Sequence, residues 1–307
     1  MTPCLAIAAL LIGCAGDPDP APDTGPDAPT PYEYERPELE PSLNAAEVEA
    51  AVRDLAPGLL RIDPYPLYDA YALALMGQEQ SCPGTYPIAG VIGWGNECTA
   101  RSGWSYAGRS QALAVHHETI DGVYYDTFGS LLTDAVLTSP DGYDLEIIGY
   151  GDLWDRPVDG GAQAVWVYFL GVFRSAFPEH ADTWLAEDLS VAVTAESWAH
   201  PEQGRWLRLD GGASPIEGDR ATLTARDLLL YSPETGTTCA TEPAGELVYR
   251  THDGEAYTLR FDGPASPEDA VSADLCDGCG TVWFEGAALG EACVDLTALT
   301  DWETRPW

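Results

Sequence analysis

The chain has 307 residues, and its fifty acidic residues against fourteen basic ones, all of them Arg, give a formal charge of -36. A nucleic-acid-binding protein needs a basic face that displaces the counterions of the phosphate backbone, and this composition excludes such a face. The charge suits cations, neutral surfaces or basic proteins as partners. Coding bias against Lys and a need for solubility would produce the same acidity without a selected role for charge.

An apolar run, LAIAALLI, spans residues 5–12 and is far shorter than the roughly 20 residues of a transmembrane helix. It predicts the hydrophobic region of a secretion signal over residues 1–13. The run leads into Leu11-Ile12-Gly13-Cys14, which resembles the lipobox of bacterial lipoproteins. That resemblance implies cleavage before Cys14, lipidation of Cys14, and sorting to the outer membrane because Ala15 follows. The protein would then be exported and bound to a membrane through Cys14.

Two observations bear on this resemblance. Residues 1–13 contain no Lys or Arg, whereas lipoprotein signals begin with basic residues, so an ordinary cleaved signal with an incidental Cys14 is the alternative. Residues 14–41 favour the lipoprotein, because after Cys14 they are rich in Pro, Asp and Glu and have almost nothing to bury. Such a segment predicts an extended, disordered tether that would hold a folded body clear of a membrane.

The body, residues 42–307, is expected to begin with helices. Asn44 and Glu47 have the spacing of a capping box, and apolar residues at helical spacing follow until Pro57-Gly58. A second short helix is expected from Leu67 to Met76, since Asp63-Pro64 precedes it and Gly77 follows it.

Beyond residue 86 the pattern predicts a mainly β fold, an antiparallel sheet or sandwich with a sandwich as the default. Seven Asp-Gly pairs separate short apolar runs and indicate hairpins. In the clearest hairpin, a two-residue turn at Asp253-Gly254 would place Val248 opposite Leu259 and Tyr249 opposite Thr258. Ala164 to Phe173 is apolar at every position and predicts a central strand buried on both faces. A boundary near 199–218 would divide the body in two. Other strands are expected near 105–118, 143–150, 189–196, 221–231 and 280–285.

Six cysteines remain once Cys4 is removed with the signal and Cys14 is lipidated. An even number in an exported chain predicts three disulfides that staple the fold. The short segment between Cys82 and Cys98 favours a local bridge, and Cys239 with Cys276 and Cys279 with Cys293 is the pairing favoured among the rest. Cys276 and Cys279 also have CxxC spacing, but neither a redox helix nor a second zinc-binding pair accompanies them.

Three groups of residues are candidates for chemistry. His116 and Glu118 would share one strand face and offer half of a metal site, while His117 would be buried beside Leu113 and Val115. Asp141, Asp144 and Glu146 lie around a turn where calcium would find oxygen ligands. Trp94 and Trp104 lie in a glycine-rich stretch where exposed rings would stack on sugars or peptides, although most Trp in a β protein lie in the core.

The alternative interpretation is that the residues of each group have only a structural role, and we favour it for all three groups. The sequence therefore predicts no catalytic residue, no metal site and no other cofactor. The body resembles uncharacterised exported lipoproteins of high-GC Gram-negative bacteria, which implies a binding or structural role at the membrane surface with a protein or glycan partner. A secreted hydrolase without a short motif, using acidic residues or His116, is the main alternative.

Overall fold

The structure is a computed structural model that describes residues 39–300 except 89–90, 95–96, 112–115, 121–122, 128–130, 159–161, 201–203, 218–219, 233–241 and 265–276. The signal, Cys14 and most of the expected tether lie outside the described residues. Contacts group residues 41–307 into one unit and residues 1–40 into another. Neither of the two α-helices in the described part is long and apolar enough to cross a membrane.

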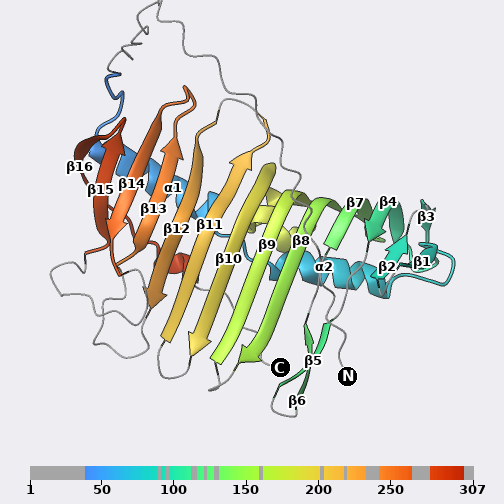
Figure 1. Ribbon diagram of the computed structural model, residues 1–307. Helices are drawn as coiled ribbons and strands as arrows, with labels where there is room; N and C mark the ends of the chain where they lie inside the picture. Colours follow the sequence, from blue (N-terminus) through green and yellow to red (C-terminus); the bar gives the residue numbers. More distant parts are fainter. Residues whose placement is uncertain are drawn as a thin grey trace, which may run out of the picture. The chain divides into compact units, whose positions relative to one another are not determined.

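A single antiparallel sheet dominates this unit (Figure 1). Its strands follow one another as a meander, in the order β1-β2-β4-β7-β8-β9-β10-β11-β12-β13-β14-β15-β16, with β3 paired to β4. A separate hairpin joins β5 to β6. The bounds are β1 Thr85–Ile88, β2 Val91–Trp94, β3 Cys98–Thr99, β4 Ser105–Gln111, β5 His116–Ile120, β6 Val123–Thr127, β7 Leu131–Thr138, β8 Asp144–Val158, β9 Ala162–Ser175, β10 Leu189–His200, β11 Gly204–Pro215, β12 Thr222–Ser232, β13 Ala244–Arg250, β14 Ala256–Asp262, β15 Cys279–Phe284 and β16 Ala287–Cys293.

Both expected helices are present, with slightly different ends. The capping box of α1 (Ala45–Leu59) is confirmed, because the Asn44 side chain accepts from the N–H of Glu47 and the Glu47 side chain accepts from the N–H of Asn44. The helix continues through Pro57, since Leu59 and the capping Leu60 are buried and hold the last turn in place. The second helix, α2 (Tyr65–Met76), begins two residues earlier than expected, directly after Pro64.

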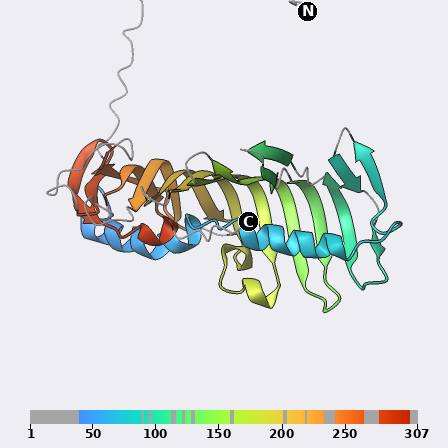
Figure 2. The same ribbon diagram turned by 90° about the horizontal axis from the view of Figure 1, so that it is seen from below.

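The helices form the second layer of the fold. Figure 2 shows α1 and α2 along one face of the sheet, with the 3-10 turns η2 (Pro178–His180) and η3 (Trp184–Ala186) on the same side. The core lies between these helices and the sheet, and Val167, Phe169 and Leu247 are among its fully buried members. The predicted mainly β, antiparallel architecture is confirmed. The default arrangement, a sandwich of two sheets, is not what the described residues form, because helices cover the apolar face of the large sheet.

We call the opposite face of the sheet the open face. The prediction that Ala164–Phe173 is buried on both faces is wrong there. This segment is the expected central strand, β9, but it is buried on one face only. Phe169 and Phe173 point to the core, whereas Leu170 on the open face is 49% exposed. An all-apolar run therefore does not mark two buried faces here. The β5–β6 hairpin lies on the open side in Figure 2, with β6 beside β8.

Two predicted strand arrangements are also corrected. Val248 lies opposite Thr258 and Tyr249 opposite Tyr257, one residue from the predicted register. The reason is a five-residue connection over 251–255, closed by hydrogen bonds between Thr251 and Glu255, in place of a two-residue turn. The expected strand over 105–118 is divided between β4 and β5, which belong to different sheets.

A possible division of the body was expected near 199–218. In the structure, β10 and β11 lie in this region and pair along their full lengths.

Candidate functional site

Aromatic side chains gather on the open face at the middle of the sheet. Alternation along each strand points these side chains away from the core, and all of them are half-buried. Cross-strand pairs join them, since Trp154 lies opposite Trp166, and Trp206 lies between Trp198 and Tyr231. We call this set the aromatic band; it comprises Tyr150, Trp154, Trp166, Tyr168, Trp198, Trp206 and Tyr231.

The rings of the band lie close to one another with related orientations. Trp198 and Trp206 have centroids 5.7 Å apart and planes within 11°, and Trp166 and Tyr168 have centroids 6.4 Å apart and planes within 13°. Tyr150 adds a tilted contact with Tyr168 at 5.6 Å. Neighbouring aromatic pairs of this kind contribute about 0.5–1.5 kcal/mol beyond their burial, so contacts between the rings help to hold the band in a defined arrangement.

Two carboxylates lie within the band. Asp152 is directly opposite Tyr168, and Glu196 is directly opposite Trp166. Glu196 accepts from the indole N–H of Trp198 at 3.0 Å, and Asp152 accepts from the hydroxyl of Tyr150 at 3.2 Å. The second oxygen of Asp152, Oδ1, is buried and has no hydrogen-bond partner in the part of the chain that the structure describes. The band therefore combines ring surfaces with strong acceptors.

Arginines compensate the acidic residues elsewhere on the sheet. Arg174 bonds to Glu146 and Asp188, and Arg260 bonds to Glu246 while its guanidinium lies 5.8 Å from the ring centre of Trp283. These exposed and half-exposed pairs each contribute little to stability. They do distinguish this charged surface from the aromatic band.

A pocket of about 360 Å³ opens on the helix-covered side, between the start of α2 and η2. Asp63, Asp69 and Glu179 supply three carboxylates to its lining, and His180 supplies an imidazole. The apolar part of the lining includes Leu73. Its volume lies within the range of about 300–1,000 Å³ that small-molecule sites occupy.

His180 is 5% exposed and held in one orientation. Its Nδ1 lies 2.7 Å from the Ser175 hydroxyl, which also accepts the N–H of Phe177. Burial lowers the pKa of His180, and the nearby Glu179 and Asp69 carboxylates oppose that shift. The imidazole is therefore neutral at physiological pH, and its Nε2 has no hydrogen-bond partner among the residues described.

The three groups of candidate residues from the sequence belong neither to the aromatic band nor to the lining of this pocket. His116, His117 and Glu118 lie on β5, opposite residues of β6, and their side chains lie outside the described residues, as do Leu113 and Val115. Thr138 donates to Asp144 and Arg174 pairs with Glu146, while Asp141 is exposed in the turn, so each acidic residue has a structural setting. The favoured core placement of Trp94 and Trp104 is confirmed, at 1% and 6% exposure.

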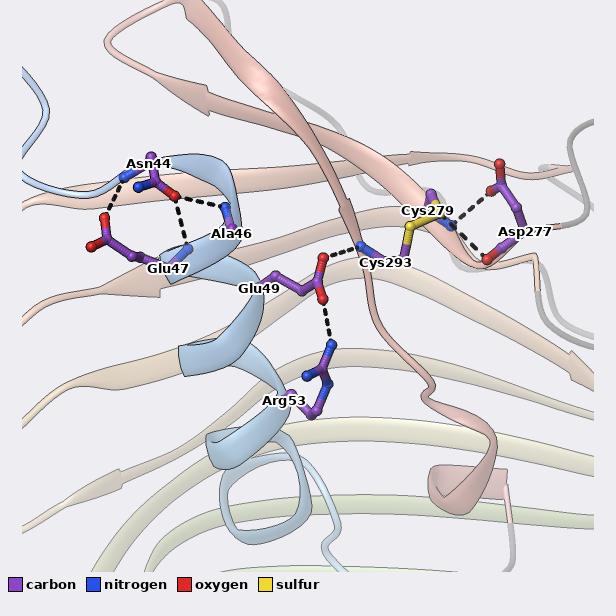
Figure 3. Close-up of polar contacts among 8 residues, drawn as sticks. All are labelled: Asn44, Ala46, Glu47, Glu49, Arg53, Asp277, Cys279 and Cys293. Carbon is purple, nitrogen blue, oxygen red and sulfur yellow. Dashed lines mark hydrogen bonds and ion pairs between the residues drawn. A yellow bond between two sulfur atoms is a disulfide. The ribbon is translucent and has the colours of Figure 1, made fainter.

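The predicted bridges Cys82–Cys98 and Cys279–Cys293 are both present. Cys239 and Cys276 lie outside the described residues. In the described part, the one group of side chains close enough to hold a metal ion is Cys279, Glu291 and Cys293, and its two sulfurs already bond to each other. Figure 3 shows this bridge beside α1, where Glu49 contacts Arg53 and the backbone of Cys293.

Sequence reasoning missed both the aromatic band and the His180 pocket. A signal for the band existed, since Trp166 and Tyr168 alternate with buried residues and Trp198 and Trp206 flank one hairpin, whereas the pocket joins segments more than 100 residues apart. Comparison with protein-family models, curated proteins and solved structures finds no match. The function must therefore be argued from the geometry.

Proposed function

We propose that this protein is an exported, membrane-tethered binding protein whose aromatic band holds a glycan chain. The single observation that carries the proposal is the group of seven half-buried aromatic residues on the open face of the sheet, opposite the helices. Soluble proteins rarely leave a large contiguous apolar patch exposed unless it binds something.

Charge and chemistry favour a glycan as the ligand. The carboxylates of Asp152 and Glu196 and the overall charge of -36 disfavour an anionic polymer. A sugar ring has an apolar C–H surface that packs on aromatic rings, and hydroxyls that donate to carboxylates. A peptide laid across a sheet face would leave its backbone groups without strand partners. A neutral or amino-bearing glycan fits these constraints best.

Cosedimentation with insoluble polysaccharide tests this proposal. The Cys14→Ser protein is mixed with a neutral insoluble polysaccharide such as cellulose and, separately, with an amino-bearing one such as chitosan. We expect binding that falls at least tenfold, about 1.4 kcal/mol, in Trp166→Ala and Trp206→Ala. Trp283→Ala is the matched control, because Trp283 is half-buried but lies on β15 outside the band. Binding that is absent, or that Trp283→Ala weakens equally, would contradict the proposal.

The anchor in this proposal is Cys14. The lipobox-like Leu11-Ile12-Gly13-Cys14 and the acidic, Pro-rich residues 15–41 support it. A lipid anchor at Cys14 followed by a long tether would place the band near the polymers of a bacterial envelope. The outer membrane is the proposed location, by the resemblance described above.

A hydrolase is the second candidate, and the His180 pocket is the observation that favours it. A neutral imidazole and three carboxylates line one pocket of suitable size. Hydrolysis of a glycan or peptide by the purified protein, abolished in Glu179→Gln but kept in Trp206→Ala, would replace the binding proposal with this one.

A further inference from the structure

The His180 pocket contains a set of groups that the proposed glycan site does not use. It lies on the opposite side of the sheet from the aromatic band, against α2, and its lining is acidic and apolar at once. We propose that this pocket binds a small organic cation, an amine or guanidinium group carried by an apolar body. The inference is independent of the glycan proposal.

The charge of the pocket lining determines whether the pocket attracts a positively or a negatively charged ligand. Asp63, Asp69 and Glu179 contribute three carboxylates, and none of the pocket's lining residues is basic apart from His180, which is neutral at physiological pH. Carboxylates in the lining attract a cationic group and repel an anionic one. An anionic ligand would be repelled by these three carboxylates.

The buried imidazole supplies the directional contact. Because Ser175 fixes Nδ1, the ring presents Nε2 as its remaining polar atom, and His180 is 5% exposed while still lining the pocket. In the tautomer in which Nδ1–H donates to Ser175, Nε2 accepts a hydrogen bond from a ligand N–H. A ligand N–H would thereby satisfy a polar atom that has no partner within the described residues.

The arrangement favours an organic cation over a bare metal ion. A metal ion needs several ligand atoms within a few ångströms of one another, and no such group in the described residues includes His180, Asp69 or Glu179. Separate carboxylates that share the lining with apolar side chains suit a larger organic ion. Tyr65 and Leu73 line the pocket and would pack against the apolar body of the ligand.

Calorimetric titration with three probes that share a phenylethyl group tests the proposal. Phenethylamine is the cation, 2-phenylethanol the neutral analogue and 3-phenylpropionate the anion, each added to the full-length Cys14→Ser protein at physiological salt. We expect phenethylamine to bind at least tenfold more tightly than either analogue, a difference of about 1.4 kcal/mol. Equal binding of the alcohol, or no binding of the amine up to about 10 mM, which corresponds to less than about 3 kcal/mol of affinity, would overturn the inference.

Variants locate the bound amine. Asp69→Asn and Glu179→Gln together keep the shape of the lining but remove two charges, and both residues are exposed enough for folding to be retained. We expect this double variant to weaken amine binding at least tenfold. Asp182→Asn is the matched control, because Asp182 is exposed beside η2 but does not line the pocket. Equal weakening in the control would mean that the amine responds only to net charge, and the inference would be wrong.

Discussion

Glu49 on α1 accepts a hydrogen bond from the backbone N–H of Cys293, 244 residues later on the edge strand β16, at 3.0 Å (Figure 3). An edge strand presents backbone groups without a strand partner, and a carboxylate from the helix satisfies one of them here. The same carboxylate contacts Arg53 one helical turn later. Glu49 therefore joins the first helix of the body to the last strand of the sheet.

The first prediction follows from this contact. We expect Glu49→Ala to lower the free energy of unfolding by about 1–2 kcal/mol, because the amide of Cys293 loses a charged acceptor. Glu49→Gln should lose less, since its amide oxygen still accepts. Arg53→Ala is the control and should cost less than about 0.5 kcal/mol, because Arg53 is exposed. Denaturant unfolding measures all three, and an equal loss in Arg53→Ala would assign the effect to the ion pair.

A second prediction concerns Glu242, which is 3% exposed. Its Oε2 accepts from the N–H groups of Asp277 and Gly278, while burial and the neighbouring Asp262 carboxylate raise its pKa to about 7. Burial is the largest cause. The backbone hydrogen bonds oppose the shift without cancelling it. Protonated Glu242 can donate a hydrogen bond to Asp262. Its Oε1 is buried and has no hydrogen-bond partner in the described part of the chain.

The sign of the pH effect follows directly. A folded pKa above the unfolded value of about 4.5 means that folding favours the protonated form. This contribution is complete below pH 4.5 and is lost as the pH rises towards 7, by at most about 3 kcal/mol. Glu242→Gln should therefore flatten the decline in stability between pH 4.5 and 7 and be more stable than the parent above pH 7. Glu217→Gln, at an exposed position, should leave the profile unchanged. Parallel profiles for Glu242→Gln and the parent would contradict the assignment.

Local patterns explain which parts of the fold were predictable. The Asn44–Glu47 capping box and the Cys82–Cys98 bridge depend on residues close in sequence, and both are confirmed. The hairpin after Val248 was found but misplaced by one residue, because a five-residue turn and a two-residue turn share the same Asp253-Gly254 signal. Short-range chemistry locates an element more reliably than its register.

The faces of the sheet were less predictable, for a physical reason. In β9 the core-facing Phe169 and the open-face Leu170 are both apolar, so hydrophobicity does not reveal which face is covered. That depends on where α1 and α2 pack, a long-range property. The aromatic band was hidden for the same reason, since its Trp and Tyr residues read as core. The His180 pocket requires α2 and η2 to meet, and no periodicity in either segment encodes that contact.

The third prediction tests the proposed lipid anchor at Cys14. We expect the parent protein to remain with membranes after a high-salt wash and to carry acyl groups on Cys14, and the Cys14→Ser variant to become soluble. Fractionation and mass spectrometry measure this. Cys4→Ser is the control, because Cys4 lies within the predicted signal and should be absent from the mature protein. Membrane retention of Cys14→Ser, together with an unmodified Cys14 in the parent, would leave the lipoprotein proposal without support.

The last prediction is a bridge between Cys239 and Cys276. The structure pairs Cys82 with Cys98 and Cys279 with Cys293, so these two are the cysteines that remain downstream of Cys14. If the chain is exported as proposed, its surroundings favour oxidised cysteines, and we expect a third bridge between these two.

Non-reducing peptide mapping measures it, with cleavage between Cys276 and Cys279 so that the two bridges separate. We expect a peptide that joins Cys239 to Cys276. In the chain-entropy model, closing this loop of about 37 residues stabilises the fold by about 4 kcal/mol, and Cys239→Ser with Cys276→Ser should lose a large part of it. Free thiols at both positions in the parent, or a linked peptide joining either residue to Cys14, would contradict the pairing. The second result would also contradict the lipid anchor, because an acylated Cys14 has no thiol to form a bridge.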